Sequence, residues 1–268
     1  MKWMRRLAAV ILIVISAACL LAGLLAAHPY ELQFRDRVSA SPSAQFPMGT
    51  DELGRDRLSR LLYGMRLSLS LAPVAALAST AIAAILGIVA GHVGGWFERG
   101  IMALTDLFLS LPWLFLILTV RAVLPLNVSP AISVTITFAL LGLLGWASAA
   151  RVIRTRVRSL EGSDFVLQAR ALGCSNERLM FAHILPNLKP VLFAQFWIAI
   201  PLYLLSEADL GLLGLGVVEP LPSLGNLLRE LINFSAVSEN LWILTPAMLV
   251  LVVVSCFHLL LPEQKGYS

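Results

Sequence analysis

Six long apolar runs restrict what this chain can fold into more than any other feature of its sequence. The runs cover residues 7–27, 67–92, 101–124, 131–150, 188–210 and 240–261. Each is long enough for a helix to cross the hydrocarbon core of a bilayer, which takes about 20 residues. Hydrophobic residues make up 58% of the chain and charged residues 13%, whereas soluble domains are nearer half apolar and a quarter charged. We therefore predict an all-α, polytopic membrane protein with six transmembrane helices, rather than a soluble protein with six buried helices.

The composition inside the runs supports this interpretation. Proline occurs in four of them, at Pro73, Pro112, Pro201 and Pro246. Bundled membrane helices accommodate such prolines as kinks, whereas a helix interior in water rejects them. Alanine, glycine and serine are frequent over residues 72–95, which predicts a closely packed helix pair.

The first run follows Lys2, Arg5 and Arg6 and could be a signal peptide. Its apolar part is longer than a signal core, and Leu25 occupies a place where a cleavage site requires a small residue. We expect this run to be a retained membrane span.

The basic residues predict the orientation of the chain. Three precede the first run and seven lie in residues 151–189, while the six in residues 28–66 are accompanied by five acids. Because lysine and arginine favour the cytoplasmic side, both termini and the loop 151–187 are predicted to be cytoplasmic.

Residues 165–187, FVLQARALGCSNERLMFAHILPN, form a polar segment between the fourth and fifth runs. Helical spacing places Phe165, Val166, Ala169 and Leu172 on one apolar face. Gly173 suits a left-handed helix end, Ser175 can cap a second helix, and Pro186 disfavours helix at Leu185. The pattern predicts helix, tight glycine turn and helix. On pattern alone, an amphipathic hairpin resting on lipid headgroups is equally acceptable.

Three motifs resemble those of permease subunits of ATP-binding-cassette (ABC) importers, in the branch that transports dipeptides, oligopeptides and nickel. The stretch ARALGCSNERLMFAHILPN is similar to the family's cytoplasmic loop signature at Ala169, Gly173, Ile184, Leu185 and Pro186. MGTDELGRDRLSRLLYGMRLSLSL, residues 48–71, resembles the segment before the second span. LGLLGLGVVEPLPSLGNLL, residues 210–228, resembles the segment after the fifth. The resemblance covers roughly residues 45–260.

The resemblance implies the transmembrane domain of a type I importer in the bacterial inner membrane. It also implies a second homologous permease subunit, two ATPase subunits and an extracytoplasmic substrate-binding protein as partners. ATP and Mg would be bound by the ATPase subunits, because this chain lacks the phosphate loop G-x-x-x-x-G-K-[ST]. Peptides are the leading substrate, with nickel, other metal chelates and sugars left open. The residues expected to couple to the ATPase are Phe165, Val166, Leu167, Gln168, Ala169, Arg170, Gly173, Ser175, Ile184 and Pro186.

The chain departs from the family pattern at three places. The acid of the family's Glu-Ala-Ala triplet is absent, since the triplet reads Leu167-Gln168-Ala169. Asp209 stands where the family has a small apolar residue. The polar C-terminal tail is replaced by HLLLPEQKGYS.

Residues 50–56 are predicted to form a capped amphipathic helix on the extracytoplasmic face, with Thr50 or Asp51 as the cap. Within it, Asp51, Gly54, Arg55 and Asp56 are candidates for contact with the binding protein or for a gate. This segment belongs to an N-terminal region, residues 1–66, and the core permease domain is expected at residues 67–262.

Other polar residues offer weaker candidates. Asp106 lies in the third run and is expected to pair only loosely with Arg99, while Glu207 and Asp209 are expected to meet water at a span end. The four histidines are too dispersed for a metal site, the three cysteines suggest no disulfide framework, and no catalytic constellation is recognisable. An ion-driven secondary transporter and a membrane scaffold are alternative functions, and nucleic acid is not an expected partner.

Overall fold

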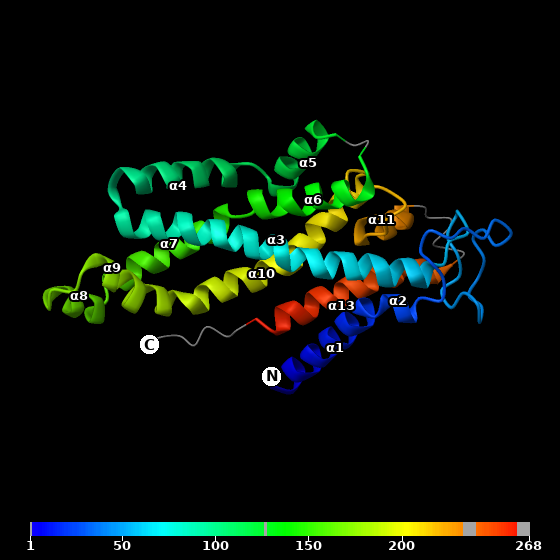
Figure 1. The fold of residues 1–268 in the computed structure, drawn as a ribbon, viewed down its shortest axis with the longest axis horizontal. Coiled ribbons are helices and arrows are strands. Elements are labelled where there is room, and N and C mark those ends of the chain that lie inside the picture. The colour runs from blue at the N-terminus through cyan, green and yellow to red at the C-terminus, as the bar shows by residue number, and fades with distance from the viewer. Residues whose placement is uncertain (1, 126–127, 233–239, 262–268) are drawn as a thin grey trace.

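The computed structural model describes residues 2–125, 128–232 and 240–261 as a bundle of helices joined by loops. Five helices are long and apolar enough to cross a membrane, and a bent pair of helices would make six. Each of the six predicted runs coincides with one of these, and the described residues hold no strand beyond an isolated bridge between Thr50 and Asp56. Figure 1 shows the hairpin α8–α9 at one end of the bundle and the loop of residues 26–56 at the other. We call these the hairpin end and the loop end.

The first and last spans lie side by side at the edge of the bundle. α1 covers Lys2–Leu20 and is followed by the short α2, Ala22–Leu25. The last span consists of a 3₁₀ turn, Leu241–Leu244, and α13, Thr245–Leu259. α1 contacts α13 (Figure 1). Both helices expose apolar side chains on their other faces. Such surfaces are what lipid requires of a spanning helix.

α3 is the central element and covers Arg57–Val93. Asp56 caps it by accepting hydrogen bonds from the backbone amides of Leu58 and Ser59, and Pro73 lies inside it. Gly87 and Gly91 leave room for α7, because a methyl group on either would come within 2.8 Å of Ile153 or Val157. The small residues of this run therefore allow the close helix contact predicted for them.

The third span is sharply broken. α4, Gly95–Ser110, and α5, Trp113–Val123, meet at an angle of 88°. The predicted span over 101–124 therefore consists of two helices, with the break at Pro112, one of the prolines expected to form kinks. Pro112 stands at the break, where its ring cannot continue α4 and its fixed φ suits the start of α5.

The fourth and fifth spans carry the hairpin between them. α6, Pro130–Leu144, leads into α7, Ala147–Glu161, and then into α8, Asp164–Ala171. The return path is α9, Asn176–Arg178, a π-helical turn, Leu179–Ile184, and α10, Leu185–Leu212. The prediction that Pro186 disfavours helix at Leu185 is wrong, because the wider π turn accommodates the proline and the helix continues. A short helix α11, Leu224–Arg229, and a 3₁₀ turn, Glu230–Ile232, then pack at the loop end.

Candidate functional site

The hairpin end is built around Gly173. Its φ of +83° is left-handed, and no atom lies within 4 Å of the position that a side chain would occupy. The amides of Gly173 and Cys174 donate to the carbonyls of Arg170 and Ala169 at 3.0 and 3.1 Å, which closes α8 with a Schellman motif. Ser175 caps α9 by accepting a hydrogen bond from the Arg178 amide. The predicted helix, glycine turn and helix are confirmed.

The hairpin side chains divide between the chain's own core and the surface. Val166 and Ile184 are fully buried and pack in a cluster with Ile153, Val157 and Leu188. Ala169 is partly buried, whereas seven of the predicted residues are exposed: Phe165, Leu167, Gln168, Arg170, Gly173, Ser175 and Pro186. The predicted apolar face breaks down at Leu172, which is 87% exposed because the chain turns there toward Gly173. The exposed residues form a mixed apolar and polar surface at the tip of the bundle.

Ion pairs brace the helices that carry the hairpin. Glu98 of α4 accepts hydrogen bonds from both Arg154 and Arg158, which lie one turn apart on α7. Glu161, at the end of α7, lies 2.5 Å from Nδ1 of His92 near the end of α3. α3, α4 and α7 are thereby tied together directly beneath the hairpin.

At the loop end, residues 50–56 form a turn instead of the predicted capped helix. One carboxylate oxygen of Asp51 accepts hydrogen bonds from the amides of Leu53 and Arg55, at 2.9 and 2.8 Å. Gly54 has a left-handed φ of +74°, and Asp56 is the cap of α3. The aspartate side chain offers these amides an alternative to helical hydrogen bonds, which is why the helix begins only at Arg57.

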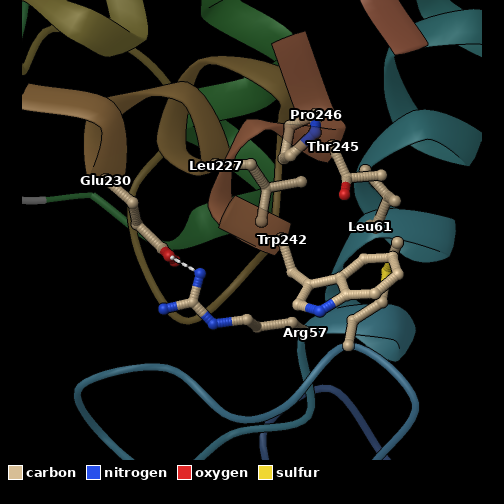
Figure 2. A pocket seen from close by; sticks show the side chains of 8 residues that line it. Arg57, Leu61, Leu227, Glu230, Trp242, Thr245 and Pro246 are labelled. Atoms are coloured by element: carbon tan, nitrogen blue, oxygen red, sulfur yellow. Dashed lines mark ion pairs between the residues drawn. The ribbon is translucent and has the colours of Figure 1, made fainter. Parts of the chain in front are cut away.

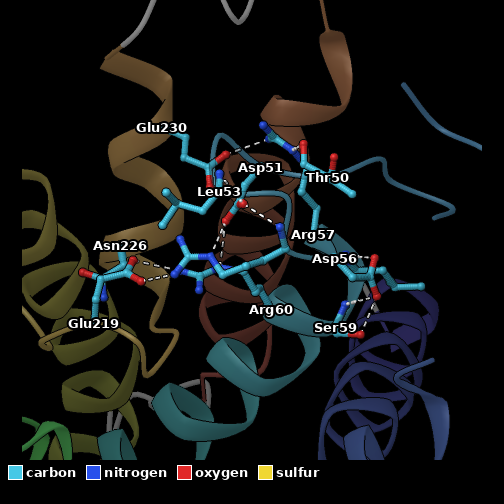
Figure 3. A network of polar contacts seen from close by, with 12 residues as sticks. Thr50, Asp51, Leu53, Asp56, Arg57, Ser59, Arg60, Glu219, Asn226 and Glu230 are labelled. Carbon is cyan, nitrogen blue, oxygen red and sulfur yellow. Dashed lines mark hydrogen bonds and ion pairs between the residues drawn. The ribbon is translucent and has the colours of Figure 1, made fainter. Parts of the chain in front are cut away.

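A charged network joins this turn to the segment after α10 (Figure 3). Arg55 donates from Nε to Asp51 at 2.7 Å and also bonds Glu219, and Arg60 donates to Glu219 at 2.9 Å. Arg60 is buried although it carries a charge. Burial lowers the pKa of Arg55, but the bonds to Glu219 and Asp51 outweigh it and the net pKa is raised. Sequence analysis missed Arg60 and Glu219, because no local pattern relates residues 159 positions apart.

A second ion pair extends the network toward the last span. Nη1 of Arg57 lies 2.7 Å from a carboxylate oxygen of Glu230. Figure 2 shows this pair beside Leu61, Leu227 and Trp242, around a cavity of about 20 Å³. Such a cavity is large enough for one water molecule, so packing at this point is nearly complete. A wider opening of about 900 Å³ lies on the other side of the network, between Asp51, Arg55, Leu212 and Arg229.

Two of the three acids within or at the ends of the spans are placed differently from expectation. Glu207 is fully buried and accepts hydrogen bonds from the Ser68 hydroxyl and the Gly225 amide, so the prediction that it meets water is wrong. Asp106 pairs with Arg151 of α7, whereas Arg99 was expected. Asp209 is exposed at the end of α10, as predicted. Among the described residues, no three His, Cys, Asp or Glu side chains come together as a metal site.

Comparison with known proteins gives consistent matches. Residues 83–261 match the family described as the binding-protein-dependent transport system inner membrane component. The chain is 31% identical to the dipeptide transport system permease protein DppC of Alkalihalophilus pseudofirmus, over 95% of this chain and 83% of that protein. It is 30% identical to the oligopeptide transport system permease protein OppC of Mycobacterium tuberculosis, over 81% and 73%. It is 29% identical to the glutathione transport system permease protein GsiD of Pectobacterium atrosepticum, over 84% and 72%.

Proposed function

We propose that this chain, which belongs to the family of binding-protein-dependent transport system inner membrane components, forms half of the path of a peptide importer driven by ATP. Peptides are the proposed substrate because similar permeases are named for dipeptide, oligopeptide and glutathione transport. A second, homologous permease subunit forms the other half of the path. A binding protein delivers the peptide, and two ATPase subunits bind ATP and Mg.

The hairpin end is the proposed docking element for an ATPase subunit. The observation that carries this proposal is the closed α8–Gly173–α9 turn, whose core residue Val166 anchors it while Leu167 and Arg170 remain exposed. Because α7 and α10 continue directly from it, a displacement of the hairpin tilts both helices, as alternating access requires. Gln168, Ala169 and Pro186 complete the proposed contact surface.

Replacing Gly173 tests the docking element. Gly173→Val places a β-branched side chain at a left-handed φ, which costs about 1–3 kcal/mol of strain and misplaces both short helices. Gly173→Asn is the matched control, since asparagine tolerates this conformation and nothing crowds the position. We expect the valine variant to insert into the membrane but to lose bound ATPase and peptide uptake, and the asparagine variant to retain both. Equal activity of the two variants would contradict the proposal.

The proposed orientation places the hairpin end and both termini in the cytoplasm of a bacterial cell, within the inner membrane. The loop end then faces outward, where the network of Asp51, Arg55, Arg60 and Glu219 closes the extracytoplasmic mouth and contacts the binding protein. Gly54 and Asp56 shape the turn that holds this network.

Cysteine labelling in intact cells tests the orientation. Ser43 is exposed at the loop end, whereas the native Cys174 is partly exposed in the hairpin. A membrane-impermeant maleimide should label Ser43→Cys in a Cys174→Ser background, and should label Cys174 only after the cells are opened. Labelling of Cys174 from outside would reverse the assignment.

A further inference from the structure

α7 exposes polar side chains where a lipid-facing helix would expose apolar ones. Its exposed residues recur at helical spacing along one face, and only one of the six is apolar: Ser148, Arg151, Val152, Thr155, Arg158 and Ser159. The exposed positions of α1 and α13 instead include apolar residues such as Val10 and Leu251. A polar stripe on a membrane helix faces water or another protein, because charged groups in hydrocarbon are costly.

The pair Asp106–Arg151 belongs to this face. Arg151 directly follows the predicted span of residues 131–150, and Asp106 lies near the start of the predicted span of residues 101–124. The side chains of Asp106 and Arg151 are 64% and 49% exposed, so both remain accessible although they pair with each other.

A pocket of about 390 Å³ opens beside this pair. Its walls come from the α4–α5 bend, from the α6–α7 junction and from α10, and they include Phe108, Leu109, Trp113 and Leu144. The indole nitrogen of Trp113 donates to Ser206 at 2.9 Å, which leaves its ring as apolar surface. Leu109 and Ser148 line the pocket three residues from Asp106 and Arg151, so the ion pair lies about one helical turn from the pocket wall.

We infer that this face of α4 and α7 lines the translocation path, and that the pocket holds an apolar side chain of the peptide in transit. Asp106 and Arg151 then offer a carboxylate to the peptide's ammonium group and a guanidinium to its carboxylate. The pocket volume falls within the roughly 300–1,000 Å³ of small-molecule sites, and an apolar cavity beside one charge of each sign matches a zwitterion with an apolar side chain. This inference rests on the proposed function and adds the residues that contact the substrate.

The reactivity of Ser148→Cys in the complete transporter distinguishes a water-filled path from a surface that faces lipid or another subunit. The Cys174→Ser background removes the partly exposed native thiol. A charged methanethiosulfonate reagent should modify position 148, and leucyl-leucine should slow the reaction severalfold. Met248→Cys on the exposed face of α13 is the control and should not react, because the charged reagent does not partition into lipid. Absence of modification at position 148 would show a lipid or subunit interface and would overturn the inference.

Transport kinetics test the ligand chemistry. Ser148→Phe fills the pocket and should raise KM for leucyl-leucine about tenfold, with little effect on glycyl-glycine. Met248→Phe, on the exposed face of α13 and outside the pocket, is the control. Asp106→Asn and Arg151→Gln should each raise KM for both peptides about fivefold, as expected of exposed charged contacts. Unchanged KM values, or loss of the partner permease on purification, would overturn the inference.

These outcomes can be separated from failure of the proposed function. If wild-type transporter imports both peptides and the Gly173→Val variant does not, the permease assignment stands whatever the Ser148 variants do. If the wild type imports neither peptide, the proposed substrate is wrong. The labelling of position 148 still decides whether this face of α4 and α7 is accessible to water.

Discussion

Glu207 of α10 accepts a hydrogen bond from the Ser68 hydroxyl of α3 at 3.1 Å, with no surface of its side chain exposed. Its other carboxylate oxygen accepts from the Gly225 amide at the start of α11, 3.3 Å away. A single carboxyl group of α10 is therefore hydrogen-bonded to both α3 and α11 at the loop end.

Removing this carboxyl group should weaken the loop end. Glu207→Ala leaves the Ser68 hydroxyl and the Gly225 amide without a partner, at about 1–3 kcal/mol for each buried group. Glu207→Gln keeps one carbonyl acceptor and should cost less. The thermal unfolding midpoints of the purified wild type and the two variants in detergent measure these losses of stability. Equal midpoints for the alanine variant and the wild type would show that water replaces the carboxyl group.

The contact between α10 and α11 depends equally on the absence of side chains. A methyl group on Gly211 would lie 2.2 Å from Cα of Gly225, which is backbone and cannot rotate away. We expect Gly211→Ala to lower the free energy of unfolding by about 1–3 kcal/mol through overpacking. Gly100→Ala on α4 is the control, since nothing lies within 4 Å of its added methyl. The idea of a close glycine contact fails if both variants unfold at the wild-type midpoint.

Glu230 predicts a pH dependence of stability. Burial raises the pKa of this carboxyl group above its ordinary value, against the opposing effect of Arg57. The folded chain thus holds this proton more firmly than the unfolded chain. The protonated Glu230 carboxyl group therefore makes its full contribution to stability below its pKa in the unfolded chain. That contribution is lost as the pH rises through its raised pKa in the folded chain.

Glu230→Gln should therefore be more stable than wild type at pH 8, and the difference should shrink toward pH 4. Unfolding midpoints measured across this range give the trend. Arg57 keeps a second partner in the variant, the Thr50 carbonyl at 2.8 Å. A variant less stable than wild type at pH 8 would mean that the ion pair with Arg57 outweighs the cost of burial.

Sequence alone was sufficient for features governed by local chemistry. The six spans follow from hydropathy, and the Gly173 turn follows from the conformational freedom of glycine between two helical patterns. The segment 50–56 shows the limit of such reasoning. The same Asp51 that suggested a helix cap uses its side chain to form a turn.

Features that depend on distant residues could not be predicted. Glu207 looked solvent-exposed because Ser68 lies 139 residues away in sequence. Arg60 and Glu219 gave no joint signal for the same reason. The bend at Pro112 had a local cause, but its angle of 88° depends on how α5 packs against α6 and α10.

The acid absent from the family's triplet leads to a test of the hairpin surface. Leu167 stands in its place and is 47% exposed, while the neighbouring Val166 is buried. An apolar side chain cannot accept a charge-assisted hydrogen bond worth about 1.5–3 kcal/mol. Docking of the ATPase should therefore rely on apolar contact through Phe165 and Leu167, with Arg170 as the charged contact.

Leu167→Glu restores the acid at an exposed position where the fold tolerates it. If the ATPase groove retains a cationic partner, the variant should bind ATPase at least as well as wild type. If the groove has become apolar, the variant buries an unpaired charge and the complex should weaken. Copurified ATPase and stimulated ATP hydrolysis measure the result, with Leu172→Glu as a control on the same hairpin outside the triplet. Leu167 lies outside the docking surface if Leu167→Glu and Leu167→Ala both leave these two quantities unaltered.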